Sequence, residues 1–201
     1  MSSQLKHRYT LEEYFELERA SEIKYEYWGG EVFAMSGTSL EHEQVFGNVF
    51  TSLRNQVRGR SCHVFSSNLR IKVPAAPPYR YPDVTALCGQ PHYEIIGGLD
   101  ALINPALIVE ILSPSTEGYD RGDKFTEYKS IPSFAEYLLI AQHRPHVTHY
   151  VRQPDGEWRY AEANMLSDVL TLPALDCVLS LSEVYQDVSF ETAERLPPSE
   201  R

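Results

Sequence analysis

The feature that most constrains this fold is a short apolar segment with a single carboxylate inside it. Residues 106–112 read ALIVEIL, and Ser113-Pro114-Ser115 follows them directly. A run this short and this rich in Leu, Ile and Val predicts a strand that is buried on both faces. Burying the carboxylate of Glu110 is costly unless a cation or hydrogen-bond donors meet it. The sequence therefore predicts that the fold supplies Glu110 with a partner.

The length of the chain and its lack of long apolar runs predict a single domain that does not span a membrane. Its 201 residues suit one domain spanning 1–201, with a frayed tail over 195–201. No run approaches the roughly 18 apolar residues of a membrane span, and the first residues are too polar for a signal peptide. We therefore expect a cytoplasmic protein with no membrane partner.

The three cysteines predict no covalent framework. Cys62, Cys88 and Cys177 are odd in number and far apart, and no CxxC pair occurs. Neither a set of disulfides nor a structural zinc site is indicated, so we expect buried free thiols.

The formal net charge is −10, which argues against a surface that binds nucleic acid everywhere. No acidic residue occurs between Glu43 and Asp83, however. Two interpretations have equal support: a phosphate-binding edge, for which Arg70, Lys72 and Arg80 are the candidates, or chance clustering on a solvated face. The basic residues of this segment are Arg54, Arg58, Arg60, Arg70, Lys72 and Arg80.

The N-terminal third predicts a helix, a hairpin and a longer helix. Thr10-Leu11-Glu12-Glu13 is a capping box for a helix over 11–20, and Gly29-Gly30 suits the turn between strands at 24–28 and 31–35. A second capping-box pattern at residue 38 opens a helix over about 39–58, with His42 at its start. The hairpin exposes aromatic side chains that could form a dimer interface, namely Tyr25, Tyr27, Trp28 and Phe33.

The remainder of the chain alternates strands and helices. Strands are predicted at 63–73, at 81–87 and at 134–141, and a hairpin joins 147–152 to 157–161. Residues 90–105 have few strong patterns and are interpreted as a surface insertion, and the acidic end offers only short apolar runs. Residues 117–130 have helical spacing, which puts Asp120, Lys124 and Tyr128 on one face.

This order of elements resembles the core of the PD-(D/E)XK nucleases. More narrowly, the chain is similar to the bacterial restriction-endonuclease-like family of the Uma2 (DUF820) type, over about residues 9–185. The resemblance implies a mixed α/β fold with a central mixed sheet flanked by helices, to which an N-terminal helix and hairpin are added. It rests on the ordered set of Tyr25-Glu26, His42, Pro82-Asp83, Glu110-Ile-Leu-Ser-Pro-Ser-Thr116, Asp120, Lys124, Tyr128 and Phe134-Ala-Glu-Tyr137.

The resemblance also implies a site and a reaction. Asp83 and Glu110 would converge on Mg²⁺ or Mn²⁺, which prefers oxygen ligands and polarises a phosphodiester for attack by water. The family adds Glu26 as a further metal carboxylate and His42 as polar support. Asp120 and Tyr128 would support the site from the following helix.

One position departs from the superfamily pattern. The E-x-K motif would place a lysine two residues after Glu110, but Leu112 stands there. Lys124 is the candidate replacement, oriented by Asp120 four residues earlier. Without the resemblance, an ordinary surface ion pair would be the simpler interpretation of these two residues; with it, we expect a catalytic lysine.

Three function classes follow. The leading hypothesis is a metal-dependent endonuclease that cleaves DNA, acting as a symmetric dimer. The alternative is a binding module that keeps the fold without useful catalysis, as Leu112 and the negative charge suggest. A hydrolase with a nucleophilic serine is disfavoured because no G-x-S-x-G motif occurs.

Overall fold

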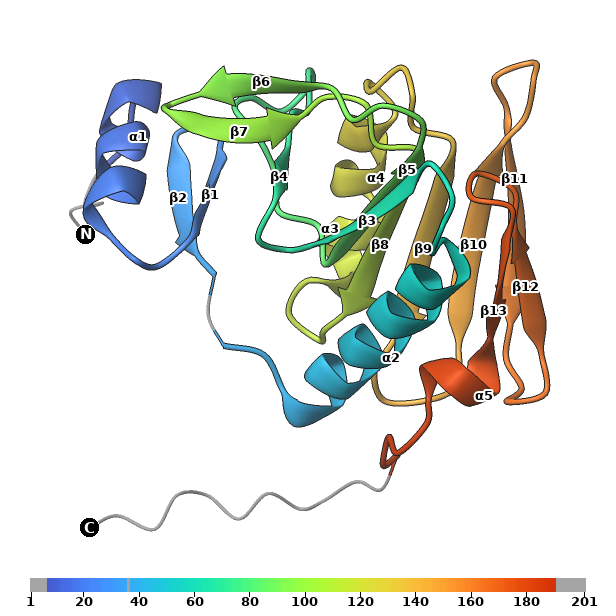
Figure 1. The fold of residues 1–201 in the computed structure, drawn as a ribbon. Helices are drawn as coiled ribbons and strands as arrows, with labels where there is room; N and C mark the ends of the chain where they lie inside the picture. The colour runs from blue at the N-terminus through green and yellow to red at the C-terminus, as the bar shows by residue number, and fades with distance from the viewer. Residues whose placement is uncertain (1–6, 36, 191–201) are drawn as a thin grey trace, which may run out of the picture.

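A computed structural model describes residues 7–35 and 37–190 (Figure 1), so the predicted tail at 195–201 lies outside the described residues. Its centre is a six-stranded sheet in the order β11-β10-β9-β8-β5-β3. The central pair, β8 and β9, is parallel and the other neighbours are antiparallel, which confirms the predicted mixed sheet. The strands are β3 (Cys62–Ser66), β5 (Val84–Cys88), β8 (Leu107–Leu112), β9 (Glu136–Ala141), β10 (Val147–Arg152) and β11 (Trp158–Ala163).

Strand β8 is buried along its whole length, as its composition predicts. Its side chains alternate between two apolar clusters. Val109 and Ile111 join the cluster on the side of helix α2 (Leu40–Gln56), whereas Ile108 and Leu112 join the opposite cluster. Because side chains alternate along a strand, Glu110 faces the same side as Ile108 and Leu112.

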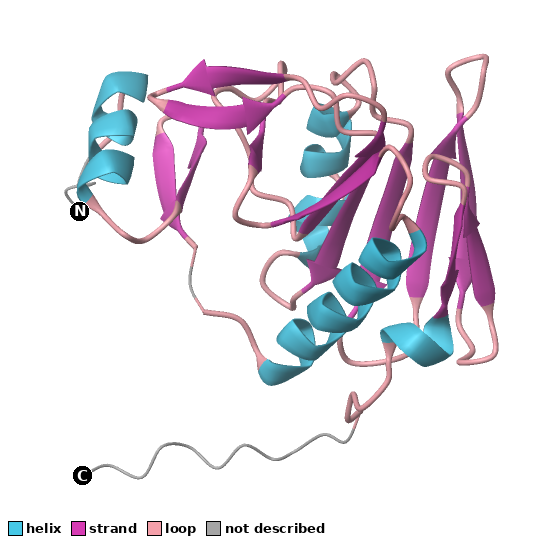
Figure 2. Cartoon of the chain, in the orientation of Figure 1, coloured by secondary structure: helices cyan, strands magenta, loops and turns pink. Residues whose placement is uncertain are grey.

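Helices cover both faces of the sheet (Figure 2). On one face lie α2, α5 (Leu181–Val184) and the hairpin of β12 (Val169–Leu172) and β13 (Cys177–Ser180), whose apolar side chains join one buried cluster. On the other face α4 (Asp123–Tyr128) contributes Phe125 and Tyr128 to the second cluster. The chain is therefore layered as the resemblance implies.

The N-terminal additions form beside this core. Helix α1 (Leu11–Ala20) has the predicted capping box, with Thr10 and Glu13 bonding each other's backbone. Strands β1 (Tyr25–Trp28) and β2 (Glu31–Ala34) pair across Gly29 and Gly30, whose φ angles of 54° and 89° require glycine. The predicted capping box, N-terminal helix and hairpin are therefore confirmed.

The predicted strand at 63–73 is wrong, because the chain turns in its middle. The amide of Leu69 donates to the carbonyl of Ser66 at 3.0 Å, so β3 ends at Ser66 and β4 (Arg70–Ile71) enters another sheet. The strand predicted at 81–87 likewise begins later, at Val84.

Residues 90–105, interpreted as a surface insertion with few strong patterns, contain regular structure that the sequence analysis does not predict. They form a hairpin of β6 (Tyr93–Ile96) and β7 (Leu99–Leu102), and β7 pairs in parallel with β4. Gly97-Gly98, with φ angles of 60° and 86°, supplies its turn and is the signal that the sequence offered.

The predicted helix at 117–130 is divided in two. Helix α3 (Glu117–Arg121) ends at Gly122, whose φ and ψ of −109° and −98° are not helical, and α4 begins directly after it. A Cβ atom at residue 122 would lie 3.2 Å from the carbonyl oxygen of Gly118, so a glycine allows the close approach of the chain at this break.

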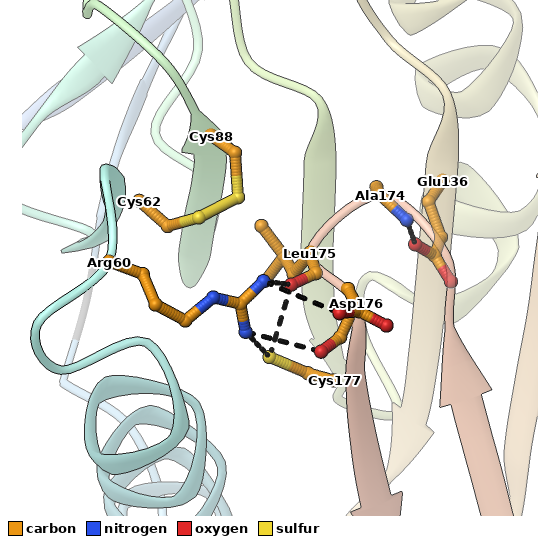
Figure 3. Close-up of a disulfide and its surroundings, with 8 residues drawn as sticks. All are labelled: Arg60, Cys62, Cys88, Glu136, Ala174, Leu175, Asp176 and Cys177. Carbon is orange, nitrogen blue, oxygen red and sulfur yellow. Dashed lines mark hydrogen bonds and ion pairs between the residues drawn. A yellow bond between two sulfur atoms is a disulfide. The ribbon is translucent and has the colours of Figure 1, made fainter.

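The expectation of three free thiols is wrong. Cys62 and Cys88 form a disulfide and Cys177 is buried and free (Figure 3). The two bonded cysteines lie 26 residues apart in sequence but directly opposite each other in the register of β3 and β5. Spacing in the sequence cannot show such an opposition, because it depends on which strands pair.

No helix in the described part of the chain is long and apolar enough to cross a membrane.

Candidate active site

A pocket of about 420 Å³ opens at the end of β8 and is lined by every residue that the sequence nominated for a catalytic or metal role. The strand register explains this convergence. Val84 lies opposite Val109, so one further step places Asp83 opposite Glu110. The start of α2 and the two helices after β8 close the pocket. The nominated residues in its wall are Glu26, His42, Asp83, Glu110, Asp120 and Lys124.

Glu110 has the partners that its burial requires. The side chain is 5% exposed, and its Oε1 lies 2.9 Å from Lys124 Nζ. The hydroxyl of Tyr128 donates to the same oxygen at 2.7 Å. Both partners come from α4, so the short helix after the break at Gly122 neutralises the carboxylate of β8.

Lys124 is buried between two carboxylates. Its side chain is 9% exposed, and Nζ lies 3.1 Å from Asp120 Oδ1 in addition to its contact with Glu110. The Asp120–Lys124 contact is an ion pair without the angles of a hydrogen bond, since the buried Oδ1 has no hydrogen-bond partner. The interpretation of Asp120 and Lys124 as an ordinary surface ion pair is therefore excluded, because both side chains are buried.

Asp83 is held by the backbone of β8 and by His42. Its Oδ2 accepts a 2.6 Å hydrogen bond from the amide of Ile111 and lies 3.4 Å from His42 Nε2. His42 is 8% exposed, and the Ser39 hydroxyl caps its helix by accepting from the His42 amide at 3.1 Å. His42 therefore lies beside Asp83, and its supporting role stays a prediction.

Glu26 reaches the same pocket from β1. Its Oε1 accepts a 3.1 Å hydrogen bond from the amide of Tyr81. Among the described residues, no group of three or more His, Cys, Asp or Glu side chains is placed to hold a metal ion. Glu26 thus lines the pocket without completing a three-ligand cluster.

Burial and the ion pair between them act in opposite directions on the pKa values of Glu110 and Lys124. Burial raises the pKa of Glu110 to about 8, while Lys124 opposes this rise. Burial alone would lower the pKa of Lys124, but Glu110, Tyr128 and Asp120 together raise it above its usual range. Lys124 is therefore the charged member, and Glu110 is costly to ionise.

The donor set fits Mg²⁺ or Mn²⁺ better than zinc. Lys124 and Tyr128 both contact Oε1 of Glu110, and the contacts to Asp83 reach Oδ2. Each carboxylate keeps a second oxygen that these contacts do not use. Mg²⁺ takes one or two protein carboxylates and retains several waters, so Asp83 and Glu110 suffice for it. Structural zinc needs four ligands, typically sulfur or nitrogen.

Two of the residues nominated to contact nucleic acid are buried. Arg70 is 8% exposed and lies 3.3 Å from Glu18 Oε2, with its guanidinium over the Tyr79 ring. Arg80 is 1% exposed and forms an ion pair with Glu127. The prediction that Arg70 and Arg80 contact nucleic acid is therefore wrong, because carboxylates inside the protein already pair with both guanidinium groups.

Lys72 is placed differently from those two arginines. It is half-buried and pairs with the exposed Glu94 at 2.6 Å. Whether it contacts nucleic acid stays a prediction. Arg54 and Arg58 of the same acid-free segment are exposed.

Several residues of the site were not found from the sequence. Ser39 also donates to Gln142 Oε1 at 2.8 Å, and both residues line the pocket. Tyr137 donates to the Asp120 carbonyl at 3.1 Å and so holds the segment that carries Lys124. Tyr137 does belong to the quoted Phe134-Ala-Glu-Tyr137 motif, but only packing shows its partner.

Comparison with known proteins agrees with this geometry. The model of the Uma2 family, described as "Putative restriction endonuclease", matches residues 11–182. The chain belongs to the Uma2 family.

Two relatives from Synechocystis sp. are uncharacterised proteins. The chain is 31% identical to slr1290 over 179 residues, covering 89% of this chain and 92% of the relative. It is 33% identical to sll1609 over 153 residues, covering 76% and 86%. A crystal structure from Anabaena variabilis, titled a putative nuclease belonging to DUF820, matches with a TM-score of 0.71 at 18% identity. It covers 88% of this chain and 97% of that one, which confirms the nuclease-like fold of this Uma2 protein.

Proposed function

We propose that this Uma2 protein is a metal-dependent nuclease that hydrolyses phosphodiester bonds of DNA. One observation carries the proposal: Asp83 just before β5, Glu110 on β8 and Lys124 on α4 line one pocket, with Lys124 Nζ 2.9 Å from Glu110. Two carboxylates beside an ammonium are the groups that phosphodiester hydrolysis requires.

Each residue has a role that follows from its contacts. Asp83 and Glu110 would hold Mg²⁺ or Mn²⁺, with Glu26 as an additional carboxylate at the edge of the pocket. The ion would supply polarisation of the phosphoryl group and a more acidic water. Lys124 would place positive charge where negative charge grows on the phosphorus oxygens. Asp120 and Tyr128 orient Lys124 and Glu110, and His42 orients Asp83.

The competing function is a binding module that retains the fold. It is favoured by a specific contact, since Lys124 already neutralises Glu110 and could act as a permanent structural counterion. The two functions differ in what the pocket binds. A nuclease binds the metal and cleaves, whereas the module does neither.

The test combines metal binding with cleavage. Calorimetric titration with Mn²⁺ should show binding to the wild-type protein and none to Asp83→Asn, which loses a ligand charge. Supercoiled and single-stranded DNA should be cleaved in Mn²⁺ by wild type and not by Asp83→Asn. Asp123→Asn is the matched control, since this exposed aspartate precedes Lys124 without lining the pocket. Equal Mn²⁺ binding by wild type and Asp83→Asn, or no cleavage of any DNA or RNA, would favour the module.

Cleavage of both strands of a duplex would need two such pockets. We propose a two-fold symmetric dimer as the simplest arrangement. Of the aromatic residues nominated for its interface, Trp28 and Phe33 are 47% and 44% exposed. Tyr25 and Tyr27 are only half exposed and pack against the buried cluster of Tyr14, Tyr79 and Tyr81.

A further inference from the structure

A second hollow adjoins the active-site pocket on the far side of Asp83 and His42. It measures about 520 Å³, and these two residues line both hollows. We call it the side pocket, and its wall includes Lys24, Phe46, Ser67 and Asn68. A substrate whose phosphodiester lies at Asp83 would therefore extend directly into the side pocket.

The polar groups of the side pocket are already oriented. Lys24 Nζ donates to the carbonyl of Ser67 at 3.0 Å and to Asn68 Oδ1 at 2.6 Å. An ammonium group can only donate, so the carboxamide oxygen of Asn68 must be the atom that faces it. The amide N–H groups of Asn68 are then turned toward other acceptors. The exposed Asn68 thus offers a fixed donor to a ligand.

The charges around the side pocket disfavour a phosphate. Glu22, Glu43 and Asp83 line it against the single ammonium of Lys24, and Lys24 is occupied by Ser67 and Asn68. A phosphate would face three carboxylates, whereas an uncharged planar ring would not be repelled. Phe46 of α2, a half-buried aromatic in the wall, provides a surface on which such a ring can stack.

We infer that the side pocket holds a nucleobase next to the phosphodiester that is cut, with Phe46 as its stacking partner and Asn68 as its hydrogen-bond donor. This inference rests on the proposed nuclease function. The base would present a carbonyl oxygen or an unprotonated ring nitrogen to Asn68. A base enclosed in this way cannot remain paired in a duplex, so the preferred substrate is single-stranded or locally unpaired nucleic acid.

Binding of a fluorescent single-stranded oligonucleotide of about ten nucleotides, measured by anisotropy in Ca²⁺, tests the inference. Phe46→Leu keeps an apolar side chain without the ring, and Asn68→Ala removes the donor. Phe46→Leu should weaken binding by about tenfold, the scale of one lost base stack, and Asn68→Ala by up to about tenfold, the scale of one lost hydrogen bond. Two matched controls should stay within about twofold of wild type. Phe190→Leu alters a half-buried ring that packs against the same apolar cluster as Phe46 but lies outside the wall, and Asn55→Ala alters an exposed amide of α2.

A second measurement separates this inference from the proposed function. The ratio of kcat/KM for the oligonucleotide to kcat/KM for an abasic tetrahydrofuran-phosphate oligomer of the same length should fall about tenfold in Phe46→Leu, because the abasic oligomer keeps the phosphodiesters but has no base. If no substrate is cleaved, the nuclease proposal fails while anisotropy still tests the pocket. Wild-type protein that binds duplex as tightly as single strands, or binds neither, overturns the inference. So does unchanged affinity in Phe46→Leu and Asn68→Ala.

Discussion

Arg80→Met should strongly destabilise the protein, because the guanidinium of Arg80 is 1% exposed and is bonded on all sides. Its Nη1 donates to the carbonyls of Tyr27 and Tyr79 at 2.8 and 3.1 Å. Its Nη2 lies 3.2 Å from Glu127 Oε2, and its Nε donates to the Tyr119 hydroxyl at 3.3 Å. Arg80 therefore joins the β1–β2 hairpin to helices α3 and α4.

The expected loss can be worked out from these contacts. Removing one partner of a buried ion pair costs about 3–5 kcal/mol, but Glu127 is 14% exposed and keeps a 3.0 Å hydrogen bond from Tyr119. Leaving a buried carbonyl without its donor costs about 1–3 kcal/mol. These contributions overlap, and methionine retains some packing. We expect a loss of about 4 kcal/mol in the free energy of unfolding.

Urea denaturation followed by tryptophan fluorescence measures this loss. Arg58→Met is the matched control, since the exposed Arg58 belongs to the same acid-free segment and should change stability by less than about 0.5 kcal/mol. Arg80→Lys should recover only part of the loss, because an ammonium cannot reach the same set of partners.

The opposite result would restore the interpretation of Arg80 as a phosphate contact. In that case Arg80→Met would cost less than about 1 kcal/mol in stability. It would also reduce the slope of log affinity for DNA against log salt by about one unit. Such a pair of results would refute the structural role of Arg80.

Three further predictions follow from the site, the charged surface and the cysteines. Lys124→Met should tighten Mn²⁺ binding, measured by calorimetry, because a competing cation leaves Glu110, yet slow single-turnover DNA cleavage by roughly 100-fold; equal cleavage rates would remove the lysine from the mechanism. Replacing the exposed Arg54 and Arg58 by Gln should reduce the salt slope of DNA binding by up to about two units, whereas an unchanged slope would mean that this face is only solvated. Thiol titration of the unreduced protein should detect one thiol, reactive only after unfolding, and three thiols would contradict the disulfide.

The elements with strong local signals were predictable from the sequence. The capping box at Thr10, the Gly29-Gly30 turn and the apolar run around Glu110 each specify their structure through nearby residues, and all three occur as expected. The turn after Ser66 was missed because its local signal is weak. The hairpin at residues 93–102 was missed although Gly97-Gly98 offers the same signal as Gly29-Gly30. Tertiary pairing decides those segments.

The site was predictable as a set of residues but not as a set of contacts. Asp83, Glu110 and Lys124 were nominated through the family pattern, and they do line one pocket. The partners of Arg70 and Arg80 were not predictable, because a basic residue in a sequence looks the same whether it meets solvent or a buried carboxylate. The same limit applies to the disulfide, which depends on the register between β3 and β5.

The position of the lysine on α4 has a consequence for how this protein can change. Leu112 belongs to the apolar cluster of Phe125, Tyr128 and Leu139, and it does not line the active-site pocket. Packing alone therefore governs residue 112, and other apolar side chains can replace Leu112 without altering the charges around Glu110. The lysine depends instead on the length of the segment between β8 and α4. A single residue inserted there would leave the strand intact and shift Lys124 relative to Glu110, so we expect an apolar substitution at residue 112 to disturb the site less than an insertion between β8 and α4.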